Sequence, residues 1–307
     1  MSNHLYYGDN LAVLRDSIAT ESIDLIYLDP PFNSNASYNV LFKGPQGNES
    51  PAQIEAFDDT WQWSDLTSGQ ALEEVKDSPY QEAAAMLDAM VGFLGKNAMT
   101  AYLCMMGVRL TELHRVLKPT GSLYLHCDPT ASHYLKVLLD AVFGASRPLN
   151  EIIWQRSTGK SLMSVRLPNN HDVILSYSKG DGYTWNQSSL YTPYDEKHLP
   201  AKTLAKYSHI DEDGRRYQLD NLINPNSNRP NLTYEFLGVT RVWRWTKERM
   251  EKAYEDGLVV QSAPGRVPRQ KRYLDEQEGL PLSDVWTDIP PLNSQAQERL
   301  GYPTQKP

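Results

Sequence analysis

The stretch Leu25-Ile-Tyr-Leu-Asp-Pro-Pro-Phe-Asn33 decides the fold. It closes a largely apolar run, residues 22–28, that predicts a strand buried within a parallel sheet. Two consecutive prolines end the strand abruptly, because neither can donate a backbone hydrogen bond to a neighbouring strand. Ligands of open α/β sheets bind at the carboxyl ends of strands. We therefore expect a binding site at Asp29, Pro30, Pro31 and Phe32.

Further along, apolar strand-like segments alternate with segments of helical periodicity. The expected strands are residues 121–128, 150–156 and 171–179. The expected helices are residues 10–18, 70–117 and 131–143, the second stopped by Pro119 and Gly121. Residues 33–66, rich in Asn, Ser, Gly and Pro, predict a long loop. This alternation predicts a parallel α/β sheet that is covered on both faces.

The pattern changes after residue 180, where Tyr, Trp, Arg, Asn and Pro become frequent. We expect one clear helix there, near residues 247–256, and an extended, proline-rich tail from Gly279. The sequence thus predicts three regions: 1–180 as the first part of an α/β domain, 181–278 as an inserted module, and 279–307 as an extended segment.

The composition is that of an ordinary globular chain, and its charge is unevenly distributed. Of the 307 residues, 40% are hydrophobic and 22% charged, with a net charge of -8. Residues 1–146 carry 8 basic and 18 acidic residues, whereas residues 147–273 carry 20 basic and 14 acidic ones. A basic middle region predicts contact with a polyanion, and the alternative is an unevenly charged solvated surface.

Several classes of protein are excluded. No apolar run is long enough to span a membrane, and the N-terminus does not resemble a secretory signal. Cys104 and Cys127, the two cysteines, cannot form a disulfide framework or a zinc site, and no other metal site is expected. We therefore expect a soluble chain of the cytoplasmic, bacterial type.

The Asp-Pro-Pro-Phe motif has the chemistry of an amine-binding site. A carboxylate and backbone carbonyls accept hydrogen bonds from an exocyclic amine, and an aromatic ring stacks on the planar base that carries it. The alternative interpretation is a proline turn that only ends a strand.

With the following segments, the motif resembles the amino-methyltransferases that methylate adenine N6 or cytosine N4 in DNA, using S-adenosylmethionine. LIYLDPPFN resembles motif IV of that family. The other similar segments are GDNLAVLR at 8–15, HRVLKPTGSLYLHCD at 114–128, NEIIWQR at 150–156, HDVILSYSK at 171–179 and YPTQKP at 302–307. Their order resembles the beta group, which includes modification subunits of restriction systems. The resemblance implies a circularly permuted, Rossmann-like methyltransferase sheet with an inserted DNA-recognition region.

The resemblance also implies roles for individual residues. Asp29, Pro30, Pro31 and Phe32 would be catalytic, with Phe32 stacking on a flipped-out base. Asp9, Asp29, Thr304, Gln305 and Lys306 would bind S-adenosylmethionine. Adenine N6 is the preferred target, because cytosine-N4 members of the family more often carry Ser where Asp29 stands. The basic insert would bind double-stranded DNA through Arg241, Arg244, Arg269 and Arg272, although a surface role is open for each arginine.

The family's glycine-rich loop, Phe-x-Gly-x-Gly, is not found in these 307 residues. We therefore expect a chain truncated before that cofactor motif, which would bind S-adenosylmethionine weakly or not at all and would be inactive alone. Alternatives stay open: cytosine-N4 methylation, modification of a protein amide or RNA base, or a non-catalytic DNA-binding subunit. A restriction subunit and a homodimer partner also stay open. His114 and His126 are expected to be structural, and Trp61 and Trp63 to pack in the core or line the base pocket.

Overall fold

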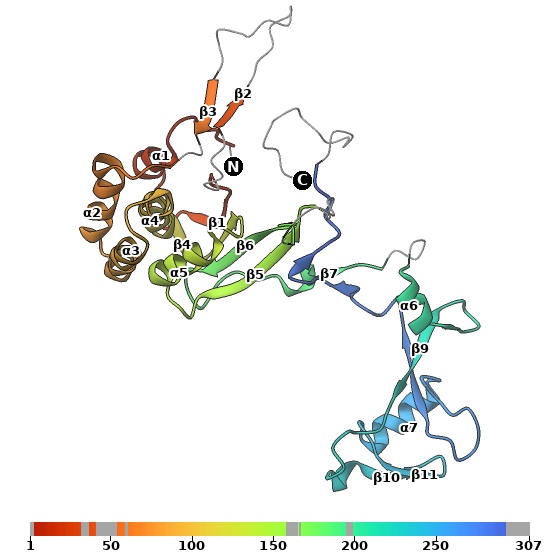
Figure 1. Cartoon of the computed structure of the whole chain (residues 1–307). Coiled ribbons are helices and arrows are strands. Elements are labelled where there is room, and N and C mark those ends of the chain that lie inside the picture. Colours follow the sequence, from red (N-terminus) through yellow and green to blue (C-terminus); the bar gives the residue numbers. More distant parts are fainter. Residues whose placement is uncertain are drawn as a thin grey trace, which may run out of the picture. The chain divides into compact units, whose positions relative to one another are not determined.

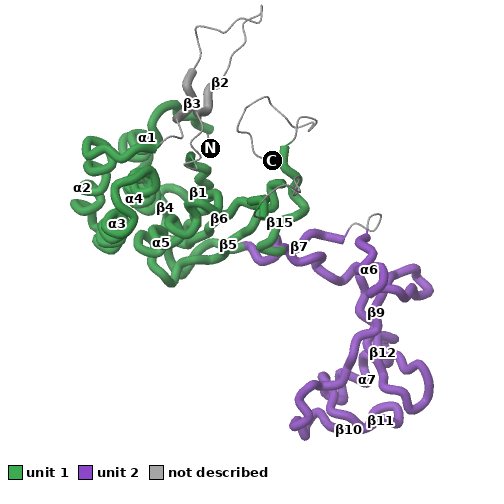
Figure 2. The backbone as a smooth tube through the Cα atoms, viewed as in Figure 1, with its two compact units in different colours: residues 1–185, 283–307 green, residues 186–282 purple. Residues whose placement is uncertain are grey.

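A computed structural model describes residues 3–31, 61–157, 165, 167–194 and 199–292, together with the backbones of 37–40 and 54–58. The chain forms two compact units (Figure 2). Unit 1 consists of Met1–Trp185 and Ser283–Pro307, and unit 2 of Asn186–Leu282. The functional roles of the three predicted regions stay predictions.

Unit 1 is built on a five-stranded sheet with the order β1-β4-β6-β5-β15 (Figure 1). Its strands are β1 (Ile23–Leu28), β4 (Leu117–Cys127), β6 (His171–Ser178), β5 (Pro148–Gln155) and β15 (Val285–Trp286). The α/β class is therefore confirmed. The expected all-parallel sheet is wrong at β6, which runs antiparallel to both β4 and β5. The end of β5 faces the start of β6, with Gln155 opposite His171, so these consecutive strands pair as a hairpin does.

The single helix expected over residues 70–117 is wrong. The structure has three helices in this range, α2 (Gln70–Lys76), α3 (Gln81–Leu94) and α4 (Ala98–Val116). Pro79 lies in the first break, and Gly95 opens the second with φ of 79°. Asn97 and Thr100 then begin α4 with a capping box, in which each side chain bonds the other's backbone N–H.

The described helices of unit 1 all pack on one face of the sheet. Residues of α1 (Asn10–Ser17), α5 (Ser132–Phe143) and the three helices above join one apolar cluster with alternate residues of the strands, such as Leu125 and Val173. The other face carries the intervening residues, among them His126 and Asp172. The expected cover of helices on both faces is therefore wrong for the residues that the structure describes.

Strand β1 is less buried than its apolar sequence predicts. It forms an edge of the described sheet and pairs in parallel with β4. Leu25 and Tyr27 point away from the helices and are 61% and 56% exposed, whereas Ile26 joins the core. The prediction that the whole strand is buried is therefore wrong. An apolar run in the sequence does not reveal that helices cover only one of the two faces of the sheet.

The stretch 33–66, expected to be a loop, contains regular structure. β2 (Ser37–Val40) and β3 (Ile54–Asp58) pair antiparallel, and a π-helix, η1 (Asp65–Gly69), leads into α2.

No helix among the residues described in either unit is long and apolar enough to cross a membrane.

Unit 2 has its own sheet and core. Its four-stranded antiparallel sheet has the order β12-β13-β9-β8, and β10 pairs with β11 as a separate hairpin. These strands are β8 (His209–Ile210), β9 (Arg216–Asn221), β10 (Thr233–Phe236), β11 (Val239–Val242), β12 (Val259–Val260) and β13 (Arg269–Tyr273). The short helices are η2 (Gln187–Leu190), α6 (Ala201–Lys206) and η3 (Pro230–Leu232). The helix expected near 247–256 is confirmed as α7 (Lys247–Glu255), and it packs with the fully buried Trp243.

The two ends of unit 2 lie side by side. β7 (Tyr191–Thr192) pairs antiparallel with β14 (Leu280–Pro281), and the Leu282 N–H donates to the Leu190 carbonyl over 2.8 Å. Gly279 is required at this junction. Its φ is +131°, and a Cβ at this position would lie 2.2 Å from the Thr192 carbonyl oxygen.

Candidate functional site

Asp29 lies directly after the carboxyl end of β1, where the sequence places the binding motif. Leu28 is in register with Leu125 of β4, so Asp29 lies level with His126, the next residue of that strand. The Asp29 side chain is 33% exposed. Pro30 and Pro31 follow without regular structure. Phe32 and the predicted cofactor residues Thr304, Gln305 and Lys306 lie outside the described residues.

A chain of polar side chains runs from Asp29 into the protein. The Asp29 Oδ1 atom lies 3.8 Å from His126 Nδ1, and His126 Nε2 lies 3.1 Å from Asp172 Oδ2. The His126 and Asp172 side chains are almost completely buried, at 1% and 3% exposed. Arg156 Nε lies 3.1 Å from Asp172 Oδ1, so the positive charge of Arg156 compensates the negative charge of the buried Asp172 carboxylate. Asp29 is therefore the part-exposed end of a polar chain that continues through the buried His126 to the buried Asp172.

Tyr27 belongs to the same arrangement. Its hydroxyl group lies 2.9 Å from His126 Nδ1, so both Tyr27 and Asp29 face one edge of the imidazole. Burial, together with the negative charges of Asp29 and Asp172, raises the pKa of Tyr27 to about 12. The phenol consequently stays protonated at neutral pH and can donate a hydrogen bond.

His126 is held from the other side by Trp154. The Trp154 ring meets the imidazole edge-on, with centroids 5.8 Å apart, and its indole N–H donates to the Ile289 carbonyl over 2.9 Å. Sequence reasoning missed His126, Asp172 and Arg156 as parts of the site. Their positions in the sequence could have indicated the site, because each lies near an end of a predicted strand. These strand ends reach the same edge of the sheet as Asp29.

Asp9, the remaining predicted cofactor residue, begins α1. Its Oδ1 atom accepts the Leu11 backbone N–H over 3.0 Å and also lies 2.7 Å from Arg109 Nη2. The Arg109 Nε atom donates to Asn10 Oδ1 over 2.9 Å. Arg109 and the helix cap thus fix the position of the Asp9 carboxylate, whose side chain is still 58% exposed.

In unit 2, one face of the four-stranded sheet combines cations with aromatic rings. Register places Arg269, Lys271, Tyr217 and Tyr273 on the same face of β13 and β9. The Lys271 ammonium lies 5.0 Å from the Tyr217 ring centroid, and that ring stacks on His209 with centroids 5.2 Å apart. We call the residues His209, Tyr217, Arg269, Lys271 and Tyr273 the basic–aromatic face.

The four predicted DNA-binding arginines have different surroundings. Arg272 points to the opposite face of β13, where its guanidinium group contacts Asp220 Oδ2 at 3.1 Å and Gln277 Oε1 at 3.2 Å. Arg241 and Arg244 are exposed and donate to the carbonyls of Thr240 and Ile223, respectively. Arg269 is exposed on the basic–aromatic face. The structure thus brings Arg269, but not Arg272, together with Lys271.

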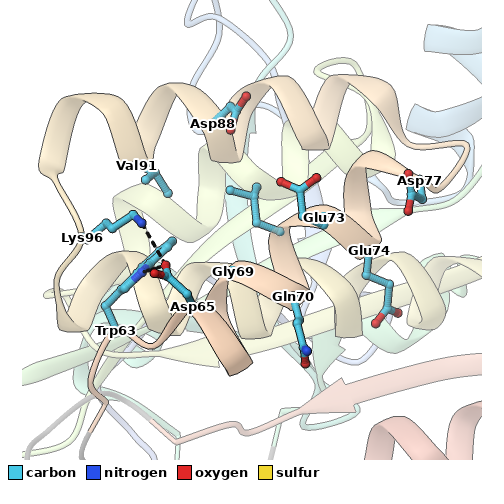
Figure 3. A pocket seen from close by; sticks show the side chains of 11 residues that line it. Trp63, Asp65, Gly69, Gln70, Glu73, Glu74, Asp77, Asp88, Val91 and Lys96 are labelled. Carbon is cyan, nitrogen blue, oxygen red and sulfur yellow. Dashed lines mark hydrogen bonds and ion pairs between the residues drawn. The ribbon is translucent and has the colours of Figure 1, made fainter.

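A separate hollow of about 660 Å³ lies among η1, α2 and α3 in unit 1 (Figure 3). Trp63 lines it, with its indole N–H bonded to Asp65, whereas Trp61 packs edge-on against the buried Tyr102. Most of the carboxylates around the hollow are paired with cations: Asp65 with Lys96, Glu73 and Asp88 with Lys76, and Glu74 with Arg15. Five carboxylates, including Asp77, line the hollow against the three cations Arg15, Lys76 and Lys96, so its surroundings carry a net negative charge.

Comparison with known proteins places the chain in a family. Residues 23–307 match the family described as DNA methylase, so the chain belongs to that family. It is 27% identical to the type II methyltransferase M.EcaI of Enterobacter cloacae over 100% of this chain and 57% of that protein. It is also 23% identical to the Mod subunit of the type III restriction-modification enzyme StyLTI of Salmonella typhimurium, over 92% of this chain and 40% of that subunit. The chain thus spans about half the length of these relatives.

Solved structures give weaker similarity. The cytosine-N4-specific PvuII DNA methyltransferase is 15% identical, with a TM-score of 0.33 over 66% of this chain and 61% of that one. A complex of M1.HpyAVI with SAM is 13% identical, with a TM-score of 0.30 over 63% of this chain and 61% of that one. Family membership therefore rests on the sequence match.

Among the described residues, no group of three or more His, Cys, Asp or Glu side chains is placed to hold a metal ion.

Proposed function

We propose that this chain is the catalytic part of a DNA methyltransferase that transfers a methyl group from S-adenosylmethionine to the N6 amine of a flipped-out adenine. The observation that carries the proposal is the position of Asp29. It is a part-exposed carboxylate at the carboxyl end of β1, followed by two prolines and supported by buried polar groups. Family membership and the names of the relatives support the same reaction class.

The chemistry assigned to the motif is hydrogen-bond acceptance. The Asp29 carboxylate and the Pro30 carbonyl accept from the two N–H groups of the amine, which localises its lone pair for attack. Phe32 stacks on the base. Flipping the base out of the duplex costs roughly a few kcal/mol, and correct placement of the reactants lowers the barrier by up to about 7–11 kcal/mol.

The described residues fit S-adenosylmethionine in charge. When bound, the cofactor supplies a methyl group activated by a positively charged sulfur, and its methionine part carries an ammonium group. The carboxylates of Asp9 and Asp29 suit these positive groups, and both side chains are partly exposed. Thr304, Gln305 and Lys306 complete the proposed cofactor site.

We propose double-stranded DNA as the substrate and unit 2 as the region that binds it. The basic–aromatic face supports this role, because its exposed cation Arg269 and the neighbouring Lys271 can contact DNA phosphates. A restriction subunit is a further proposed partner, since one relative is a Mod subunit. The preference for adenine over cytosine rests on Asp29, since the resemblance associates Ser at this position with cytosine-N4 enzymes.

The test is methyl transfer from labelled S-adenosylmethionine to unmethylated genomic DNA, measured with the full-length gene product. We expect label on N6-methyladenine and a loss of at least about 100-fold in the Asp29→Ala variant, because the amine then loses its charged acceptor. Asp24→Ala is the matched control. This carboxylate lies on the same strand, is 76% exposed and pairs with Lys118, so its loss should leave transfer unchanged.

Other outcomes separate the alternatives. If the label is found on N4-methylcytosine, the proposed catalytic site stands and the target base is cytosine. DNA binding without any methyl transfer would identify a non-catalytic DNA-binding subunit. Full activity of Asp29→Ala would exclude the proposed amine acceptor.

A further inference from the structure

We propose that the loop of residues 224–231 in unit 2 reads the edges of DNA bases, and that Asn228, Arg229 and Asn231 select the recognition sequence. The inference rests on the proposed function, in which unit 2 binds double-stranded DNA. It separates the residues that select a sequence from the cations proposed to contact phosphates. We call residues 224–231 the Asn-rich loop.

Both ends of the Asn-rich loop are bonded to one buried residue, Trp243, which belongs to the core of unit 2. The Asn224 amide donates to the Trp243 carbonyl over 3.3 Å, and the Trp243 backbone N–H donates to the Leu232 carbonyl over 2.8 Å. The Leu232 N–H and the Thr233 hydroxyl both donate to the Arg229 carbonyl, each over 3.0 Å. The core therefore fixes where the loop begins and ends.

The loop is also ordered from within. The Asn224 Oδ1 atom accepts the Asn226 backbone N–H over 3.0 Å, and the Asn226 Oδ1 atom accepts the Asn228 N–H over 3.0 Å. Pro225 and Pro230 restrict the backbone further, because each ring fixes φ. A loop that is ordered before binding loses little conformational entropy when it contacts a ligand.

Three side chains of the loop take no part in holding it together. Asn228 cannot repeat the turn made by the two earlier asparagines, because the residue two positions on is Pro230, which has no backbone N–H. Asn228, Arg229 and Asn231 are exposed, and their side chains have no hydrogen-bond or ion-pair partner among the described residues. The alternative, that the asparagines only form turns, explains the first two and not the last two.

The charge of the loop suits a polyanion. No acidic residue lies between Asp220 and Glu235 in the sequence, so no neighbour along the chain neutralises Arg229. Arg215, in the same unit, is by contrast paired with two carboxylates. The Arg229 guanidinium group therefore keeps its donors available to a ligand.

The chemistry of the three side chains favours base edges over phosphates. An Asn amide binds adenine through N6 and N7, and an Arg guanidinium binds guanine through O6 and N7, both in the major groove. A neutral amide adds little to the attraction of phosphates, which depends on positive charge. Two amides beside one guanidinium thus match the donor and acceptor pattern of bases.

The loop leaves the sheet beside the cations proposed to contact phosphates. Asn221, at the end of β9, is directly opposite Arg269 of β13, so both side chains lie on the basic–aromatic face. The Asn-rich loop begins three residues after Asn221. Phosphate contacts by Arg269 and Lys271 would therefore set the register in which the loop meets the bases.

Substitutions that conserve charge separate base reading from phosphate binding. Asn228→Ala and Asn231→Ala each remove an amide and no charge. Arg229→Lys keeps the charge and removes the planar group that binds guanine at two points. Arg249→Lys is the matched control, because Arg249 is exposed in the same unit but lies on α7 over the Trp245 ring, 4.4 Å from its centroid.

The experiment selects bound duplexes from a random pool with the full-length protein and sequences them. We expect each of the three loop variants to lose its base preference at one or two positions of the wild-type sequence. Affinity for the preferred duplex, measured by anisotropy, should fall by about 5- to 150-fold, the range for loss of one base contact. Affinity for an unrelated duplex and the salt slope should stay as in the wild type, and Arg249→Lys should select the wild-type sequence.

The result that overturns the inference is a selected sequence that is the same in the wild type and in all three loop variants. This holds even if the variants bind every duplex more weakly, because a uniform loss indicates phosphate contact or altered folding. A wild type that selects no sequence also overturns it. A wild type that selects a sequence but transfers no methyl group refutes the proposed reaction instead, and the loop variants still decide this inference.

Discussion

Replacing Arg269 with Ala should weaken DNA binding in a salt-dependent way. Arg269 is exposed on the basic–aromatic face beside Lys271, and its removal deletes one cation from the surface proposed to contact phosphates. Arg272 lies three residues along the same strand, points to the opposite face and is paired with Asp220. Arg272→Ala is therefore a matched control that removes the same charge from the other side of β13.

The expected size follows from counterion release. Each phosphate contact lowers log K by about 0.9 per tenfold increase in salt. Loss of one contact should consequently weaken binding by about eightfold at about 0.1 M salt and reduce the salt slope by about 0.9. The double variant Arg269→Ala/Lys271→Ala should lose about 60-fold and reduce the slope by about 1.8.

The assay is fluorescence anisotropy of a labelled DNA duplex, titrated with the full-length protein at several salt concentrations. Circular dichroism of each variant checks that unit 2 remains folded. The reasoning would be refuted by a salt slope that is the same in Arg269→Ala as in the wild type. It would also be refuted if Arg272→Ala reduced the slope more than Arg269→Ala does.

Two further predictions concern stability. Trp243→Ala should destabilise unit 2 by about 3–5 kcal/mol, because the indole is fully buried and its N–H donates to the Tyr234 carbonyl over 2.9 Å. Calorimetry should show the loss in one transition only, since the core clusters of the two units share no residue, and a shift of both transitions would contradict this. Burial lowers the pKa of His114 from 6.5 to about 4, so the unfolded chain binds a proton in this range and the folded chain does not. The free energy of unfolding in urea should therefore fall as the pH drops from about 6.5 to about 4. The variant His114→Asn keeps an acceptor for the Tyr80 hydroxyl and should make this pH dependence weaker. An equally steep fall in the variant would exclude His114 as the source of the pH dependence.

Much of the fold could be predicted from local sequence patterns. Apolar runs located β1, β4, β5 and β6, and periodicity located α1, α5 and α7. The errors arose where the answer depends on packing. The exposed Leu25 and Tyr27 belong to an apolar run, and nothing in that run indicates which face the helices cover. The break at Gly95 was hidden by apolar periodicity that continues on both sides of it.

The candidate site was predictable only in part, for a similar reason. Asp29 could be found because its signal is contiguous, with an apolar strand before it and two prolines after it. His126 and Asp172 are separated from it by about 100 and 140 residues, and only strand order and register bring them together. A histidine in an apolar strand has the same local pattern whether it fills space or faces a carboxylate.

The paired ends of unit 2 have a consequence for how such proteins can change. β7 and β14 lie side by side, and Leu190 and Leu282 are joined by a backbone hydrogen bond. Unit 2 is inserted into the chain of unit 1, and its two ends are adjacent. A unit with adjacent ends can be exchanged without altering the path of the chain that carries it, because that chain needs to supply only two neighbouring attachment points. Recognition units from different relatives could therefore be transplanted between Thr192 and Leu280, with Gly279 kept for its close approach to Thr192. Under the proposed assignment of DNA binding to unit 2, such chimaeras would acquire a new target sequence while keeping the proposed catalytic residues of unit 1.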